Sequence, residues 1–207
     1  METDEEQLEK LKSWFREYGL SIVVGVVIGT GSLFGYRYWV DYGDRSAEAA
    51  SAHFAEMIQA LEVENDDAAA RHAESLLADY AGTDYAIMAH LTLARLHVYQ
   101  SEFAAAAEQL RQVVATTANQ PLGYLARKRL AAIQLQMSQP DQALTTLSAD
   151  FPAEFSGGIE ELKGDVYAVQ GRVVEAAEAY RRALSAAPGP ANREFLQQKL
   201  DDLGVTG

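Results

Sequence analysis

Nineteen consecutive residues without a charge, residues 18–36, constrain the fold of this 207-residue chain more than any other feature. The rest of the chain carries 17 basic and 30 acidic residues, so the stretch stands apart from its surroundings. As a helix that rises about 1.5 Å per residue, it would span roughly 28 Å, close to the ~30 Å hydrocarbon core of a bilayer. We therefore predict a transmembrane helix over residues 18–40, preceded by a tail over residues 1–17 and followed by a domain over residues 41–207.

A cleaved secretory signal and a buried core helix are the alternatives to an anchor. A signal peptide has a short basic segment, an apolar core of about 7–15 residues and a small-x-small cleavage site. Here the preceding segment is long and mostly acidic, and bulky aromatic residues follow the apolar stretch. Such rings suit the boundary between lipid and water, which favours an uncleaved anchor. Its predicted interfacial residues are Tyr36, Arg37, Tyr38 and Trp39.

The orientation of the anchor follows from the basic residues near its two ends, since these resist translocation. Lys10, Lys12 and Arg16 precede the stretch, whereas Arg37 and Arg45 follow it. The short tail is easily retained, and a long C-terminal domain can be translocated regardless of its charge. We predict that the N-terminus is cytoplasmic and that the C-terminal domain lies across the membrane.

Small residues within the apolar stretch form possible contact faces for another membrane helix. Gly25 and Gly29 are four residues apart and Ser32 continues their face, while Gly31 and Gly35 form a second pair. Small residues at this spacing let membrane helices approach closely. Glycine is common in membrane helices in any case, so ordinary composition remains the alternative.

Beyond the anchor, composition excludes several classes of function. Residues 41–207 carry 24 acidic and 13 basic residues, a net charge of −11, which argues against binding to nucleic acid. The acidity suits solubility, and alternatively the attraction of basic or unfolded clients. The chain has no Cys, hence no disulfide framework and no thiolate metal site.

A helical repeat organises the C-terminal domain. Apolar residues recur every three or four positions, and Gly and Pro fall between the apolar runs, so we predict an all-α domain. Its last unit carries Gly164, Tyr167, Ala176, Tyr180, Ala183 and Pro188 at the spacing of the tetratricopeptide signature. The same frame recurs upstream at Ala131, Gln134, Ala143 and Leu147, and again at Ala94, His97, Ala106 and Leu110.

The small residues of this frame are predicted packing positions, one on each helix of a pair, where the two helices approach to about 8–10 Å. For a single alanine in an alanine-rich hairpin the match could be chance, but the full match in the last unit favours a repeat solenoid. Residues 46–63 and 66–80 are predicted as a divergent first pair. Residues 191–203 are predicted as a capping helix that covers the open end.

Residues that could carry chemistry are few. His90 and His97 are seven apart, which does not fit the i, i+4 pair that binds zinc from one helix. The chain contains no HExxH, GxSxG, P-loop or GxGxxG motif, and its paired carboxylates look like solvated helix faces. We therefore expect no catalytic site, no metal and no cofactor, and a protein that is not an enzyme.

The whole arrangement resembles the YfgM family, the tetratricopeptide-like ancillary subunits of the SecYEG translocon in Gram-negative inner membranes. The resemblance rests on the GYRYW end of the anchor, with LTLARLHV and AAAAEQL in support. It implies a single-pass inner-membrane protein with a periplasmic repeat domain. It further implies partnership with the translocon, the periplasmic chaperone PpiD, exported polypeptides and, in some bacteria, a stress-response regulator.

Two other functions remain open at the level of sequence. An assembly adaptor of another cell-envelope complex would use the same architecture to hold a peptide ligand. A ligand with a terminal carboxylate would need a basic cluster, for which the candidates are Arg127, Lys128, Arg129 and Lys163. Homodimerisation through the anchor or the repeats is the third option.

Overall fold

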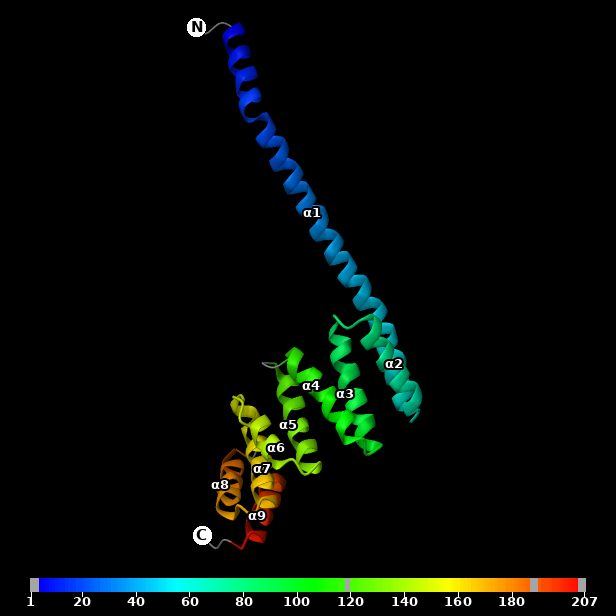
Figure 1. Ribbon diagram of the computed structural model, residues 1–207, viewed down its shortest axis with the longest axis vertical. Coiled ribbons are helices and arrows are strands. Elements are labelled where there is room, and N and C mark those ends of the chain that lie inside the picture. The colour runs from blue at the N-terminus through cyan, green and yellow to red at the C-terminus, as the bar shows by residue number, and fades with distance from the viewer. Residues whose placement is uncertain (1–3, 118–119, 187–189, 205–207) are drawn as a thin grey trace. The chain divides into compact units, whose positions relative to one another are not determined.

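The computed structural model describes residues 4–117, 120–186 and 190–204, which are entirely helical apart from short connections (Figure 1). The chain divides into two units, Met1–Ala49 and Ala50–Gly207. Within the described residues the helices are α1 (Asp4–Glu62), α2 (Asp66–Asp79), α3 (Asp84–Tyr99), α4 (Phe103–Thr117), α5 (Pro121–Gln136), α6 (Pro140–Leu147), α7 (Ala153–Val169), α8 (Val173–Ala186) and α9 (Pro190–Asp202). The all-α prediction is confirmed.

The first unit consists of the part of α1 that contains the apolar stretch. Apolar side chains such as Leu20, Phe34 and Trp39 are more than 70% exposed there, which water alone would disfavour. Within the described residues, the segment Arg16–Glu62 is the one that is long and apolar enough to cross a membrane, with a mean hydropathy of 1.7 over its best 18 residues. The predicted N-terminal membrane-spanning helix is thus present as a helix.

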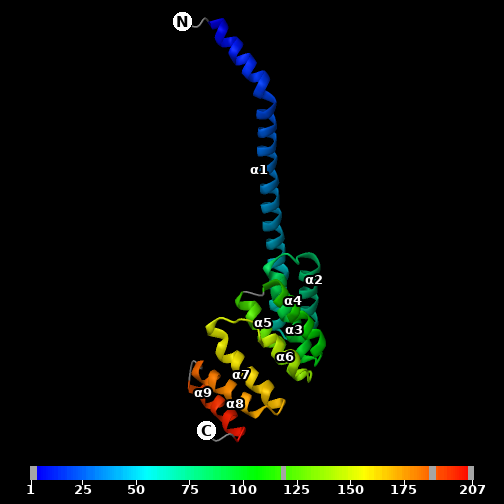
Figure 2. The ribbon, with the colours of Figure 1, turned by 60° about the vertical axis from the view of Figure 1, so that its left-hand side comes forward.

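The second unit is a stack of helical pairs (Figures 1 and 2). Residues 50–62 of α1 share a core with α2, and the pairs α3–α4, α5–α6 and α7–α8 follow. From α2 onwards each helix packs against its neighbour in the chain, and α5 also packs against α7, the first helix of the next pair. One pair cannot bury its apolar face alone, so stacking supplies the core.

The turn inside each pair has the same backbone conformation in all four pairs. Glu64, Ser101, Ser138 and Gly171 have φ values of 55°, 61°, 59° and 72°. The next residue in each case donates its N–H to the carbonyl five positions earlier, as from Glu102 to His97 at 2.8 Å. The repeat frame is therefore visible in the backbone, and the first pair obeys it although its sequence is divergent.

The small residues of the frame lie in the core. Ala94 is 4% exposed, and the side chains of Ala106, Ala131, Ala143 and Ala176 are fully buried. Gly164 and Tyr180 are buried as well, while Tyr167 is half-buried with the Arg172 guanidinium 4.4 Å from its ring centre. Pro188 lies outside the described residues.

Helix α9 closes the end of the stack. Leu196 and Leu200, which are 3% and 9% exposed, pack into the core of α7 and α8, as a capping helix requires. Phe195, the residue before Leu196, lies outside this buried face and is 52% exposed. The buried stripe runs through residues 196, 200 and 203, and residue 195 lies about 100° to its side.

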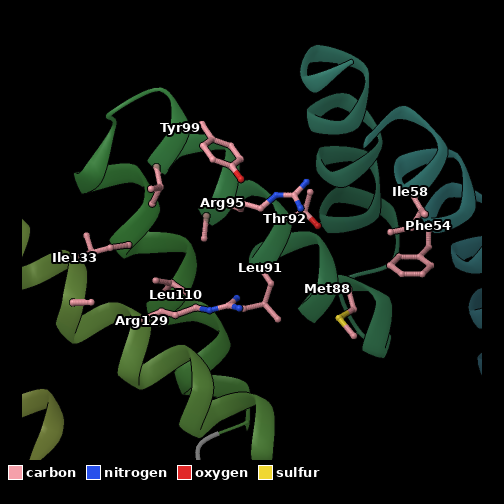
Figure 3. Close-up of a pocket in the computed structure, with 13 residues that line it drawn as sticks. Phe54, Ile58, Met88, Leu91, Thr92, Arg95, Tyr99, Leu110, Arg129 and Ile133 are labelled. Carbon is pink, nitrogen blue, oxygen red and sulfur yellow. The ribbon is translucent and has the colours of Figure 1, made fainter. Parts of the chain in front are cut away.

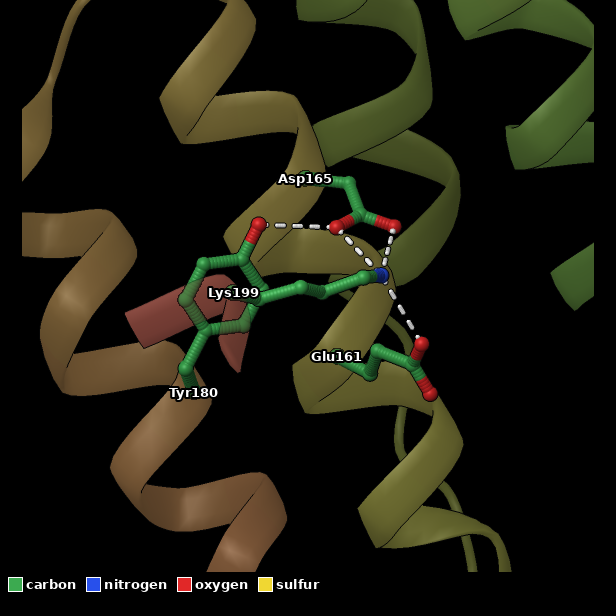
Figure 4. Close-up of polar contacts among 4 residues, drawn as sticks. All are labelled: Glu161, Asp165, Tyr180 and Lys199. Carbon is green, nitrogen blue, oxygen red and sulfur yellow. Dashed lines mark hydrogen bonds and ion pairs between the residues drawn. The ribbon is translucent and has the colours of Figure 1, made fainter. Parts of the chain in front are cut away.

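A polar cluster fixes α9 to α7 (Figure 4). The Lys199 ammonium donates hydrogen bonds to Glu161 at 2.9 Å and to Asp165 at 2.8 Å, and the Tyr180 hydroxyl donates to Asp165 at 2.8 Å. Burial works to lower the pKa of Lys199, but the two carboxylates outweigh it and the pKa is raised. Burial and then the bond to Asp165 raise the pKa of Tyr180.

Candidate functional site

A groove lies among the first helices of three successive pairs (Figure 3). Its volume is about 680 Å³, and the whole groove belongs to the second unit. It is lined by Phe54 and Ile58 of α1, by seven residues of α3, by Leu110 of α4 and by Arg129, Ala132 and Ile133 of α5. A groove of this size and apolar lining is the ordinary form of a binding site.

Helix α3 supplies most of the lining because it is apolar on two faces. One face, with Ala89 and Leu93, is buried in the core. The other carries the groove residues Met88, Leu91, Thr92, Arg95, Val98 and Tyr99, which recur at helical spacing. An amphipathic surface helix needs only one apolar face, so the second face is available for a partner.

Several apolar side chains of the groove remain accessible to solvent. Ile58 is 37% exposed, Met88 and Val98 are each 38% exposed, and Tyr99 is 72% exposed. The arrangement offers contact area for apolar side chains together with the Tyr99 hydroxyl, and within the described residues it brings no nucleophile and base together. Such an exposed apolar surface suits the binding of a partner.

Two guanidinium groups give the groove a positive charge. Arg95 of α3 and Arg129 of α5 both line it, and Figure 3 shows Arg129 reaching from α5 towards Leu91. Both side chains are exposed, and neither makes an ion pair with any residue in the described parts of the chain. In a domain of net charge −11 they are a local concentration of positive charge, which a carboxylate could pair with.

The basic cluster considered from the sequence does not come together. Arg127 stacks over the Phe151 ring at 5.8 Å, Lys128 lies against α7 beside Gly158, and Lys163 pairs with Glu160 at 2.8 Å. Of those four residues, Arg129 is the one that lines the groove. Arg95 also lines the groove and was not predicted from the sequence, although the spacing of Arg95 from Met88, Leu91 and Val98 places all four residues on one face of the helix.

The glycine faces of the first unit are open. A Cβ placed at Gly25, Gly29, Gly31 or Gly35 would meet no atom within 4 Å beyond the helix itself. Ser32 and the interfacial residues Tyr36, Arg37, Tyr38 and Trp39 are exposed. Their contacts with membrane helices and with the membrane boundary stay predictions.

The histidines fall into two groups. His90 hydrogen-bonds to Gln109 at 2.6 Å, and His97 to Glu102 at 2.7 Å, so packing and local hydrogen bonds account for both. His53 and His72, 19 residues apart, lie together with Glu56 at the first pair. This cluster could not be predicted from the sequence, because it depends on how α1 and α2 pair.

Comparisons with known proteins match this architecture. The model of the tetratricopeptide repeat-like domain family matches residues 12–205. Proteins named ancillary SecYEG translocon subunit are similar: the one from Escherichia coli K12 is 31% identical over 204 residues, covering 99% of this chain and 98% of its own. The one from Haemophilus influenzae is 28% identical over 200 residues, covering 97% of each chain.

Solved structures are similar in fold. MamA from Desulfovibrio magneticus RS-1 has a TM-score of 0.58 at 14% identity, covering 75% of this chain and 93% of its own. BtubC from P. vanneervenii also has a TM-score of 0.58 at 16% identity, covering 78% of this chain and 82% of its own. The family match across residues 12–205 and the 31% identity over almost the entire chain show that this chain belongs to the tetratricopeptide repeat-like family of the ancillary SecYEG translocon subunits.

Proposed function

We propose that this protein is a membrane-anchored scaffold of the Sec translocon, which assists the trafficking or folding of exported proteins together with a periplasmic chaperone. Relatives of nearly the same length, named ancillary SecYEG translocon subunits, support the proposal. We assign the protein to the bacterial inner membrane, with residues 1–17 in the cytoplasm, residues 18–40 in the bilayer and residues 41–207 in the periplasm.

The observation that carries a binding role is the groove between α1, α3 and α5. Its exposed apolar side chains match the apolar side chains that an unfolded chain displays, and Arg95 and Arg129 match a carboxylate. We assign as occupant an apolar segment of an exported polypeptide that also carries an acidic residue. Helix-in-groove and extended modes both suit such a segment.

The anchor contributes by raising the effective concentration of the groove near the translocon. Tethered partners meet at effective concentrations of the order of millimolar, so weak contacts with a client are sufficient. The glycine faces at Gly25 and Gly29, and at Gly31 and Gly35, are the proposed contacts with a translocon helix. The chaperone partner would be recruited to the same assembly.

The test of the groove uses the full-length protein in mild detergent and a short labelled peptide rich in Leu and Val with two Asp residues. The double variant Arg95→Glu, Arg129→Glu should bind this peptide roughly tenfold or more weakly, because it places like charges opposite the peptide carboxylates. A second peptide, with Lys in place of both Asp residues, should bind the wild type weakly and the double variant more tightly.

The matched control is Lys128→Glu, which reverses a basic residue that points at α7 and not into the groove. It should leave peptide binding unchanged. Equal affinity of the wild type and the double variant for the acidic peptide would remove the groove as the client site. The membrane role would then depend on the anchor alone.

A further inference from the structure

We propose that His53, Glu56 and His72 form a binding site for a divalent transition-metal ion of the zinc class. His53 and Glu56 lie one turn apart on the last part of α1, and His72 lies on α2. The three residues belong to the second unit and none of them lines the groove. The site is therefore separate from the proposed client site.

The distances match the coordination sphere of zinc. Glu56 Oε2 lies 3.5 Å from His53 Nδ1 and 3.2 Å from His72 Nδ1. Bonds of about 2.0–2.1 Å in tetrahedral geometry separate neighbouring ligand atoms by roughly 3.3 Å. One ring nitrogen of each histidine and the carboxylate oxygen all lie within 4.8 Å of one another. Small rotations of the two rings would therefore bring the two histidine nitrogens to the separation that tetrahedral geometry requires.

One of these ligand atoms is left unsatisfied by the protein. His53 Nδ1 is buried and has no hydrogen-bond partner within the described parts of the chain, since its separation from Glu56 does not meet hydrogen-bond geometry. Buried polar atoms in folded proteins are nearly always paired. A metal ion that accepts the nitrogen lone pair would satisfy it. The Tyr80 ring, whose centre is 5.6 Å from that of His53, helps to hold the imidazole in place.

The ligand set selects the kind of ion. Two imidazoles and one carboxylate suit Zn²⁺ and its neighbours in the first transition row, whereas Mg²⁺ and Ca²⁺ prefer oxygen ligands alone. Three protein ligands leave a fourth position for water or for a group of a partner. The side chains of His53, Glu56 and His72 are 37%, 55% and 33% exposed, so an ion can enter from solvent. Once bound, it would link α1 to α2 and stabilise the first pair.

The test uses the full-length protein, made without a histidine tag, freed of metal and kept in mild detergent. Calorimetric titration should show one Zn²⁺ per chain, unaffected by excess Mg²⁺, and Zn²⁺ should raise the thermal unfolding midpoint. Co²⁺ in the same site should give the strong visible absorption of a tetrahedral complex.

Two variants distinguish binding at this site from nonspecific binding of metal ions by exposed histidines. His72→Gln should weaken Zn²⁺ binding roughly tenfold or more and abolish the Co²⁺ absorption, because it removes one of three ligands. His90→Gln is the matched control and should change neither the Zn²⁺ affinity nor the Co²⁺ absorption, since His90 is hydrogen-bonded to Gln109 and lies outside the cluster. Equal Zn²⁺ affinity in the wild type and His72→Gln, or no stoichiometric binding by the wild type, would overturn the proposal.

Discussion

The ring of Tyr180 occupies the space that a side chain at position 164 would need. A Cβ at Gly164 would lie 2.4 Å from Tyr180 Cε1, well inside van der Waals contact. The hydroxyl of the same ring donates to Asp165, the residue after Gly164, at 2.8 Å. This close approach of α8 to α7 is the physical reason for the tetratricopeptide signature in the last repeat.

The substitution Gly164→Ala should therefore destabilise the protein, although alanine normally favours a helix. The added methyl group would displace the Tyr180 ring and strain its bond to Asp165, at a cost of about 1–3 kcal/mol. Thermal unfolding of the full-length protein in detergent, followed by circular dichroism, measures the effect. Gly157→Ala is the matched control on the same helix, because its Cβ would meet Ala186 at an ordinary 3.5 Å. It should leave stability unchanged or raise it.

The turns inside the repeats predict a gain of stability. Ser101 and Ser138 hold φ values of 61° and 59°, a left-handed conformation that Gly171 adopts without strain in the last repeat. Ser101→Gly and Ser138→Gly should each stabilise the protein by about 0.5–1 kcal/mol after the greater freedom of glycine in the unfolded chain is subtracted.

The control for these turns is Ser148→Gly, where φ is −80° and glycine relieves no strain. It should be neutral or destabilising. The thermal unfolding midpoints of the variants test this prediction. If Ser148→Gly raised stability as much as Ser101→Gly does, the gain would not come from relief of the left-handed conformation.

Stability should fall at alkaline pH because the cluster at α9 titrates there. The pKa values of Lys199 and Tyr180 are both raised by folding. A raised pKa means that the stabilisation is complete below the unfolded pKa values, about 10.4 and 10, and is lost as pH rises through the folded ones. We expect the unfolding midpoint to decline above about pH 10.

The variant Lys199→Met assigns this decline to the cluster. At neutral pH it should cost about 1–2 kcal/mol, because Glu161 and Asp165 lose their cation. The difference in stability between wild type and variant should then shrink as pH rises above the unfolded lysine pKa of about 10.4, because the unfolded wild type loses its proton there and the raised pKa of folded Lys199 is the source of the stabilisation that is lost. A difference that stays constant from pH 8 to pH 11.5 would contradict the assignment.

The sequence was sufficient for the parts of the fold that depend on local pattern. The uncharged stretch predicts the apolar helix, and Gly164 with Tyr180 marks a packing contact within one helical pair. The groove and the histidine cluster depend instead on how helices stack. Arg95 and Arg129 belong to different pairs, and His53 and His72 to different helices, so their proximity is a property of the assembled solenoid.

The central claim, that the anchor places this scaffold at the translocon, is tested most directly by site-specific photocrosslinking in native inner membranes. A photoreactive residue at Ile28, on the side of the helix that carries Gly25, Ser32 and Gly35, should capture a SecYEG subunit. Val23 lies on the opposite side, about 140° around the helix from Ile28 at 100° per residue, and a probe there should capture lipid or nothing. Both positions are more than half exposed, so both probes can react. Selective capture of a SecYEG subunit from Ile28 is the predicted result, and recovery of no Sec component from either position would contradict the account.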